Sequence, residues 1–365
     1  MTKVLFIRYK KKNGILDGGE QVTEMHYDTL TSLVGKDQVE TIYIHNQDKK
    51  RSIIDYLRGV LYFPFDYHFG LTPKRVRQLC LTAQKHDIVF IDRSVFGIIA
   101  KKLKESGYQG KVITFFHNVE ALYFDSKISK RIPFRRFIIK SADHNDAYSC
   151  RYSDKTIALN KRDDDTLFER YQRRADMLIP IVFRDKYLST EPDNAFTRTK
   201  PECLFIGSYF APNNEGLLWF VKNVLPYVEI NFKVVGKGME RLKVEEEVMR
   251  DIKVIGSVPD LAPYITEADI MILPIFKGSG MKVKTCESLM FGKHILGTDE
   301  AFEGYMADYD RIGGKCNTAD EYIAKINEFI AAPRPRFNTY SRQIYLENYS
   351  ETVMTERMKK VLFGD

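Results

Sequence analysis

A glycine-rich turn followed by two lysines is the most chemically suggestive stretch of the sequence. In "FKGSGMKVKTCESLMFGK" (276–293), a Gly-Ser-Gly turn (278–280) follows an apolar run and precedes a predicted helix. Lys282 and Lys284 fall near the start of that helix, where the helix dipole disfavours cations and favours a bound anion. We therefore predict that the amides of the turn and the two ammonium groups bind an anion.

One carboxylate accompanies these lysines. Glu287 lies three residues after Lys284 and therefore on the same face of the predicted helix. It could accept two hydrogen bonds from a ribose diol, or it could pair with Lys284 on the helix surface. Both interpretations remain open at this point.

A second polar group ends an apolar run in the first half of the chain. "FFHNVEALYF" (115–124) places His117, Asn118 and Glu120 directly after a predicted strand. An imidazole there can donate to a sugar hydroxyl or accept a proton. The alternative is that Asn118 caps the next helix.

A glycine-containing loop follows the first predicted strand. "NGILDGGEQV" (13–22) could approach a ligand through its backbone amides, or it could be an ordinary turn. It matches neither G-x-G-x-x-G nor G-x-x-x-x-G-K-[ST], so the dinucleotide and P-loop interpretations lose their main support.

The elements that must position these residues alternate along the chain. Short apolar, β-branched runs separated by helical patterns predict parallel sheets covered on both faces. The predicted strands are 3–9, 39–44, 87–92, 111–118, 155–159, 177–182, 202–208, 231–236, 252–257, 269–275 and 294–298. The predicted helices include 19–34, 214–228, 239–250, 282–292 and a long helix over 340–363.

These series predict an α/β fold with two doubly wound domains. The expected boundaries are an amino-terminal domain at 1–183, a linker at 184–201, a second domain at 202–340 and a carboxyl-terminal helix at 341–365. In such sheets, ligands bind at the carboxyl ends of the strands, where the strand order reverses. The loops just after strands are therefore the places to look for chemistry.

Composition sets limits on the class of protein. The chain has 365 residues, 44% of them hydrophobic, and a net charge of +7, which suits phosphate ligands, an anionic membrane or nucleic acid without choosing among them. The amino terminus is predicted to be a strand rather than a signal peptide, and no run is long enough to span a membrane. Five scattered cysteines predict neither disulfides nor a zinc site, so a cytoplasmic location is expected: Cys80, Cys150, Cys203, Cys286 and Cys316.

Several runs in the second half together resemble a known family. These include "FIGSYFAPNNEGLLWFVKNVLP", "VVGKG", "VIGSVPDLAPYITEADIMILPIFKGSGMKVKTCESLMFGKHILGT" and "AFEGY". They resemble the carboxyl-terminal domain of GT-B glycosyltransferases, close to the family-four retaining enzymes (group 1), over about residues 202–305. The first half is similar more loosely, through the first loop and "FHNVE".

The resemblance implies a GT-B fold, with two Rossmann-like domains facing across a cleft, and assigns roles to residues. The implied catalytic residues are Lys284, Lys282 and His117. The implied donor-binding residues are Gly278, Ser279, Gly280, Met281, Glu287, Gly207, Ser208, Gly236, Val258 and Thr298. The implied acceptor-side and first-loop residues are Gly18, Gly19, Asn118 and Glu120. No metal and no cofactor other than the nucleotide sugar is expected.

Two departures from the family pattern bear on the donor. Ser279 stands where the first glutamate of the E-x7-E motif is expected, and Glu287 matches the second. The basic residues often found after the first strand of the second domain are replaced by Ser208 and by Asn214 or Glu215. Neutralisation of a diphosphate must then depend on Lys282, Lys284, amides and helix dipoles.

The implied activity is transfer of a sugar from a nucleoside diphosphate sugar, with UDP favoured, to a glycan or lipid-linked acceptor in polysaccharide or glycoconjugate biosynthesis. A nucleotide-sugar epimerase of the same fold and a non-catalytic partner subunit are the alternatives. A homo-oligomer is left open.

One basic segment suggests a membrane surface. "SKISKRIPFRRFIIKSA" (126–142) interleaves cations with Ile and Phe, which is typical of a segment lying on an anionic bilayer at the inner membrane face. The candidate contacts are Lys130, Arg131, Arg135 and Arg136. The alternative is a solvated helix face over core residues. A nucleic-acid role is weaker, since no recognised binding motif accompanies the segment.

Overall fold

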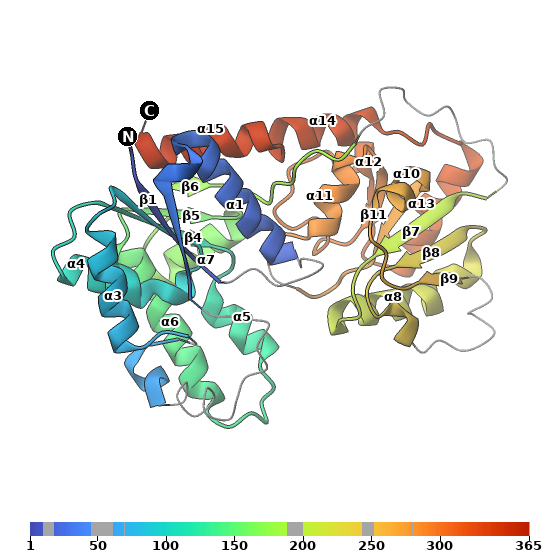
Figure 1. Cartoon of the computed structure of the whole chain (residues 1–365). Coiled ribbons are helices and arrows are strands. Elements are labelled where there is room, and N and C mark those ends of the chain that lie inside the picture. Colours follow the sequence, from blue (N-terminus) through green and yellow to red (C-terminus); the bar gives the residue numbers. More distant parts are fainter. Residues whose placement is uncertain are drawn as a thin grey trace. The chain divides into compact units, whose positions relative to one another are not determined.

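The computed structural model describes residues 1–9, 18–44, 61–68, 70–187, 200–242, 252–278 and 280–364. They form two compact units (Figure 1). Unit 1 comprises Met1–Pro180 together with Glu351–Asp365, and unit 2 comprises Ile181–Ser350. Residues 181–183, expected in the amino-terminal domain, and residues 184–187, expected in the linker, thus belong to unit 2, whereas linker residues 188–199 lie outside the described part of the chain.

Unit 1 is built on a parallel sheet with the strand order β2-β1-β3-β4-β5-β6. Its strands are β1 (Val4–Arg8), β2 (Val39–Tyr43), β3 (Ile88–Ile91), β4 (Lys111–Phe116), β5 (Lys155–Ala158) and β6 (Met177–Leu178). Each lies within a predicted strand. The central strand β1 is buried along its whole length, and β3 likewise, because helices cover both faces of the sheet.

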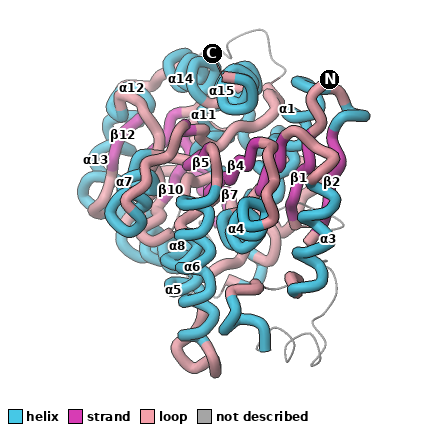
Figure 2. The backbone as a smooth tube through the Cα atoms, turned by 90° about the vertical axis from the view of Figure 1, so that its left-hand side faces the viewer, coloured by secondary structure: helices cyan, strands magenta, loops and turns pink. Residues whose placement is uncertain are grey.

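The helices of unit 1 cover its sheet. They are α1 (Gly18–Val34), α3 (Pro73–Ala83), α4 (Gly97–Glu105), α5 (Glu120–Lys127), α6 (Arg135–Tyr152), α7 (Lys161–Tyr171) and α15 (Glu351–Phe363), with 3₁₀ turns η1 (Lys36–Gln38), η2 (Phe63–Phe65) and η3 (Ser94–Phe96). Helix α15 packs on α1, whereas α4 packs between α3 and α6 (Figures 1 and 2). Figure 2 shows the strands in the interior and the helices outside them.

Unit 2 has a second parallel sheet, with the strand order β12-β11-β10-β7-β8-β9. Its strands are β7 (Glu202–Ile206), β8 (Asn231–Val235), β9 (Ile252–Ile255), β10 (Ile270–Leu273), β11 (His294–Gly297) and β12 (Gly313–Lys315). All but β12 lie within predicted strands. The run "GGK" of β12 was not predicted as a strand because it is short and has no apolar side chain.

The helices of unit 2 follow these strands. They are α8 (Ala211–Asn223), α10 (Ala262–Glu267), α11 (Val283–Met290), α12 (Tyr309–Ile312), α13 (Ala319–Ala331) and α14 (Thr339–Asn348), with 3₁₀ turns η4 (Leu225–Tyr227) and η5 (Met239–Arg241). Helix α13 begins with a capping box between Thr318 and Glu321. Most of the predicted helix 239–250 lies outside the described residues.

The predicted long helix at the carboxyl end is wrong as a single element. Residues 339–363 form two helices, α14 in unit 2 and α15 in unit 1, and the chain between them passes through Tyr349 and Ser350. The Tyr349 side chain is buried, and its hydroxyl accepts a hydrogen bond from the Met306 backbone N–H at 2.8 Å. The break between α14 and α15 thus coincides with a contact between Tyr349 and a residue distant in the sequence.

Both sheets reverse their strand order at one point. In unit 1 the order reverses between β1 and β3, and in unit 2 between β7 and β10. The helices that follow these strands begin beside these points, where ligands bind in doubly wound sheets. The fold class predicted from the sequence is therefore confirmed as two doubly wound units. The point of strand-order reversal in each unit is the expected location of a ligand-binding site.

The described residues include all five cysteines, which are buried free thiols. In the same part of the chain, no helix combines the length and the hydropathy that crossing a bilayer requires.

Candidate functional site

Lys284 lies at the point in unit 2 where the strand order reverses. It is in the first turn of α11, which follows β10, and its Nζ donates to Asn213 Oδ1 at 2.6 Å, on helix α8 that follows β7. The same ammonium lies 4.7 Å from the centre of the Phe205 ring. Among the described residues, no carboxylate forms an ion pair with it. Lys284 is therefore a half-buried cation held by neutral groups.

The electrostatics of this location favour an added anion. Burial, together with the nearby charge of Lys282, lowers the pKa of Lys284 to about 7 against the attraction of Glu287. Glu287 is only 9% exposed, and burial raises its pKa to about 7 against the attraction of Lys186 and Lys284. Both groups thus change charge near neutral pH, and an anion beside Lys284 would favour its charged form.

The structure separates Lys282 from Lys284. Lys282 is the N-cap residue of α11, and its Nζ donates to Glu300 Oε1 at 2.6 Å and to the Gly280 carbonyl at 2.7 Å. The Gly278 backbone passes close to this pair, because a Cβ there would lie 2.8 Å from Lys282 Cε and 3.0 Å from Glu300 Oε1. Lys282 thus has an acidic partner, whereas Lys284 has none among the described residues; that both lysines face an anion remains a prediction.

Glycines allow close packing around this point. A Cβ on Gly216 would lie 1.6 Å from the Pro274 carbonyl oxygen, so α8 can approach the end of β10 only with glycine there. Gly236 has a φ of 153°, and its Cβ would lie 2.0 Å from the Gly207 carbonyl oxygen. Asn213 Nδ2 donates to the Ser208 carbonyl at 2.8 Å, which fixes the loop after β7. These contacts support the backbone that surrounds Lys284.

The other predicted donor-binding residues have varied surroundings. Thr298 is buried, and its hydroxyl donates to the Ile275 carbonyl and accepts from the Ala301 backbone N–H at 3.1 Å, so it joins two loops internally. Met281 is buried and Val258 is half-buried, whereas Ser208 is exposed. Ser279 lies outside the described residues.

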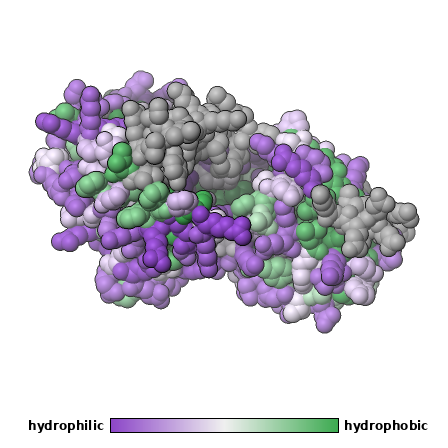
Figure 3. All heavy atoms as spheres, turned by 90° about the horizontal axis from the view of Figure 1, so that it is seen from below, coloured by the Kyte–Doolittle hydropathy of each residue, from purple (hydrophilic) through white to green (hydrophobic). Residues whose placement is uncertain are grey.

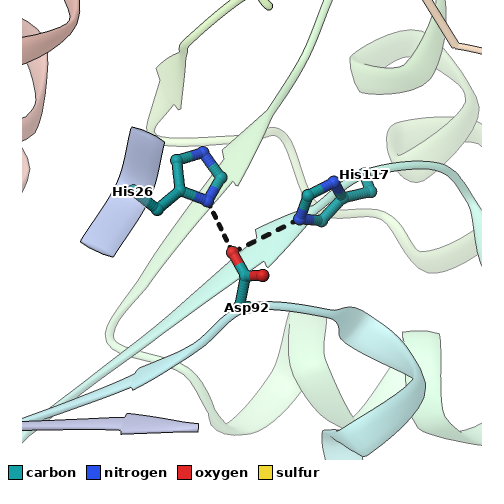
Figure 4. A group of neighbouring side chains, drawn as sticks. All are labelled: His26, Asp92 and His117. Atoms are coloured by element: carbon teal, nitrogen blue, oxygen red, sulfur yellow. Dashed lines mark hydrogen bonds and ion pairs between the residues drawn. The ribbon is translucent and has the colours of Figure 1, made fainter. Parts of the chain in front are cut away.

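A buried polar network occupies the corresponding point of unit 1. Asp92, directly after β3, contacts His26 on α1 and His117 directly after β4 (Figure 4). Its Oδ1 lies 2.5 Å from His26 Nδ1 and 3.3 Å from His117 Nε2, while its Oδ2 accepts from Thr23 Oγ1 at 2.6 Å. All four side chains are buried. Three elements thus converge on one carboxylate.

This network sets the charge and orientation of His117. Burial opposes the charge of Asp92, but His117 and His26 outweigh it and hold the pKa of Asp92 well below its usual range. Burial lowers the pKa of His117 to about 4, against the attraction of Asp92. His117 Nε2 lies 3.3 Å from Asp92 Oδ1 without hydrogen-bond geometry, but the negative charge of Asp92 favours the tautomer with hydrogen on Nε2, which leaves a lone pair on Nδ1. His117 is therefore a neutral imidazole with one basic nitrogen.

Glu120 lies next to this network. Its Oε1 is 3.6 Å from Arg93 Nη1, and burial raises the pKa of Glu120 against the attraction of that guanidinium. Asp146 accepts from the Ala121 backbone N–H at 3.0 Å, and burial raises its pKa well above the usual value. Glu120 Oε1, which faces Arg93, and Asp146 Oδ1 are buried and form no hydrogen bond. Arg93 thus compensates the charge of Glu120 without a hydrogen bond at close range.

Two predictions for this region need correction. Asn118 is not the helix cap considered from the sequence, because Val119 is the N-cap of α5 and no side chain caps that end. Gly18 and Gly19 are the first residues of α1 rather than part of a flexible loop. The preceding loop residues 13–17 lie outside the described residues.

The three network residues also form a potential metal-ligand set. One ligand atom from each of His26, Asp92 and His117 lies within 4.8 Å of the others. A metal ion at about 2.1 Å from each atom would hold the ligand atoms roughly 3 Å or more apart. The 2.5 Å separation of His26 Nδ1 and Asp92 Oδ1 is instead that of a hydrogen bond. The residues as placed therefore fit a hydrogen-bonded network better than a metal centre.

Sequence reasoning missed Asp92, His26 and Glu300. Asp92 is the last residue of the predicted strand 87–92, so the same strand-end argument that selected His117 could have found it. His26 lies within a helix and Glu300 after β11, and neither has a local pattern that distinguishes it.

Comparison with known proteins places these observations in a family context. Residues 200–331 match the family model described as glycosyl transferases group 1. No curated protein matches the chain significantly.

Solved structures match along nearly the whole chain. HepE of Anabaena in complex with UDP is 12% identical, with a TM-score of 0.69 and 99% of each chain covered. Sucrose-phosphate synthase of Thermosynechococcus elongatus is 12% identical, with a TM-score of 0.69 and coverage of 99% of this chain and 98% of its own. The lipopolysaccharide outer core galactosyltransferase WaaB, solved in its apo form, is 14% identical, with a TM-score of 0.64 and 99% of each chain covered.

At these identities the structural likeness shows the fold, which is that of GT-B glycosyltransferases. The resemblance expected from the sequence is thereby confirmed: residues 200–331 match the model of the group 1 glycosyl transferases, and the fold is that of the solved structures compared.

Proposed function

We propose that this protein transfers a sugar from a nucleoside diphosphate sugar, with a UDP-sugar favoured, to a glycan or lipid-linked acceptor. The observation that carries the proposal is Lys284, a half-buried ammonium without an acidic partner among the described residues, at the switch point of a group 1 glycosyltransferase domain. HepE, which shares the fold, was solved with UDP and with UDP-glucose. These facts support a nucleotide-sugar donor.

Unit 2 would bind the donor. As the glycosidic bond breaks, negative charge builds on the leaving diphosphate, and Lys284 with the amides at the start of α11 would stabilise it. Glu287, one turn along the same helix, would accept hydrogen bonds from the ribose hydroxyls once ionised. In this proposal the stabilising charge comes from the protein rather than from a metal.

Unit 1 would bind the acceptor and orient its hydroxyl. His117 is neutral at physiological pH and is oriented by Asp92, so its Nδ1 could accept a hydrogen bond or a proton from that hydroxyl. Arg93 and Glu120 offer further hydrogen-bonding groups beside it.

A donor screen tests the proposal. Purified protein is mixed with UDP, GDP and dTDP and with their sugars, and the shift in Tm is measured. One nucleotide should raise the Tm at concentrations near its Kd, and its sugar should be hydrolysed slowly or transferred when acceptor glycans are added. Release of an epimeric nucleotide sugar without acceptor would indicate the epimerase alternative. Absence of any nucleotide-dependent shift would contradict the proposal.

A further inference from the structure

The turn that joins α5 and α6 has an unusual surface for a soluble domain. Within residues 128–137, Ile132 is 42% exposed, and Phe134 and Phe137 are each 49% exposed. The two phenylalanine rings lie side by side, with their centres 6.3 Å apart. Large apolar side chains gathered at one exposed place mark an interaction surface more often than isolated ones do.

The backbone of this turn is also unusual. Phe134 has a φ of 64° and a ψ of 7°, a left-handed conformation that is uncommon for a bulky residue. It is the N-cap of α6, and no side chain caps that helix end. The fold thus keeps a bulky apolar side chain at an exposed helix start, in a backbone conformation that costs free energy.

Cations outnumber acids around these rings. Residues 126–142 contain six cations and no acid. Lys130, Arg131, Arg136 and Lys140 are exposed. The nearest preceding acid, Asp125, forms an ion pair with Arg135 at 2.5 Å. The flanking acids Asp125 and Asp143 pair with Arg135 and Arg170, so the surface combines exposed apolar rings with an excess of exposed cations.

Arg135 has a different role from its neighbours. Besides pairing with Asp125, its guanidinium donates to the Ile128 carbonyl at 3.0 Å and to the Asp125 carbonyl at 2.8 Å. It holds the two ends of the turn together, so we remove it from the set of membrane-contacting cations expected from the sequence.

The turn projects from unit 1. In Figures 1 and 2 it lies at the end of α5 and α6 that points away from the sheet. Figure 3 views the molecule from the side to which the turn points, and on that side strongly hydrophilic atoms adjoin hydrophobic ones.

We propose that this turn docks the protein on an anionic lipid bilayer, with Phe134, Phe137 and Ile132 entering the interface and Lys130, Arg131 and Arg136 contacting lipid phosphates. Rings insert at the boundary between headgroups and acyl chains, and cations add electrostatic attraction to anionic lipid. Nucleic acid would use the same cations, but the exposed rings have no recognised nucleic-acid motif around them. The proposal is independent of the proposed transferase function.

Vesicle sedimentation of the full chain tests the proposal. Sucrose-loaded vesicles of phosphatidylcholine with about one third phosphatidylglycerol are compared with vesicles of phosphatidylcholine alone. The protein should bind the anionic vesicles and bind less at high salt, because screening weakens charge attraction. The variant K130S/R131S/R136S should lower the partition coefficient on the order of a hundredfold, since each cation near an anionic surface contributes about fivefold.

Matched variants separate this surface from general effects. K74S/R77S/K85S removes the same charge from exposed positions on and after α3 and should bind as the unmodified protein does. F134S/F137S should weaken binding at least tenfold, whereas L81S/Y227S, at exposed apolar positions elsewhere, should not. Circular dichroism and thermal unfolding confirm that each variant is folded.

Three results would overturn the proposal. One is no binding of the unmodified protein to anionic vesicles. Another is equal loss of binding in the α3 control. A third is binding of a labelled single-stranded oligonucleotide that K130S/R131S/R136S abolishes while F134S/F137S leaves both oligonucleotide and vesicle binding unchanged.

Discussion

The two units place polar residues at equivalent points of similar sheets, yet the two groups differ in how they hold charge. In unit 2, the Lys284 ammonium is hydrogen-bonded to the neutral Asn213 amide and lies half-buried beside glycine-rich loops. In unit 1, Asp92 is buried and hydrogen-bonded on both oxygens, and it fixes two imidazoles. The positive charge of Lys284 is therefore available to a ligand. The negative charge of Asp92 is instead engaged by contacts within unit 1.

In the proposed mechanism, this difference corresponds to a division of tasks between the units. A group that must stabilise charge developing on a leaving diphosphate should be incompletely neutralised before the ligand arrives. A group that must orient a hydroxyl gains from a fixed tautomer and a fixed position. Variants can disrupt each arrangement separately, and the largest loss of turnover is expected from replacing Lys284 in unit 2.

Replacing Lys284 by alanine should lower kcat on the order of 100-fold, because it removes the main electrostatic stabiliser in the proposal. Steady-state turnover of the nucleotide sugar selected by the donor screen provides the measurement. Lys277→Ala is the matched control, since Lys277 belongs to the same loop but is 75% exposed and pairs with Glu215. Near-normal turnover of Lys284→Ala would remove Lys284 from the mechanism.

Replacing Asp92 by asparagine should lower kcat roughly tenfold to a hundredfold with a smaller change in KM. The amide would no longer attract the Nε2 hydrogen of His117, and loss of the negative charge would lower the pKa of His117 below its value of about 4. An acid limb of the pH–rate profile that depends on His117 should then move to lower pH. Asp87→Asn, just before β3, is the control, and an identical effect there would argue for a structural role only.

The comparison also explains which site the sequence could reveal. Lys284, Glu287 and the glycine turn fall within 18 consecutive residues, so helix periodicity and the dipole argument were enough to group them. The unit 1 network joins residues 26, 92 and 117, which meet only because β3 and β4 are neighbours and α1 packs beside them. The pairing of Lys282 with Glu300 likewise requires that β10 and β11 lie side by side.

The fold was more predictable than the sites. Eleven of the strands lie in apolar runs that the pattern selects, while β12 has no such run and the break between α14 and α15 has no proline or glycine to mark it. The latter features depend on tertiary contacts, such as the hydrogen bond from the Met306 backbone to the Tyr349 hydroxyl.

Replacing Lys284 by methionine should make the folded state more stable, by about 1 kcal/mol at pH 6. The pKa of Lys284 is about 7 in the folded state and ordinary in the unfolded chain, so the folded state binds fewer protons between these values. The cost of burying the charge is therefore fully present below pH 7 and decreases as the pH rises toward 10.5. Urea unfolding at pH 6 and pH 9 should show a larger gain at pH 6, whereas a loss of stability there would contradict the assigned burial cost.

The central claim is that Lys284 is only partly protonated until a diphosphate binds beside it. Proton uptake on UDP binding tests this claim most directly. Calorimetric titration at pH 8, in buffers of different ionisation enthalpy, should show uptake of about one proton per UDP, because the bound diphosphate restores the charge on Lys284. Lys284→Arg, which stays charged, should bind UDP without that uptake. The same uptake in Lys284→Arg, or none in the unmodified protein, would contradict the account.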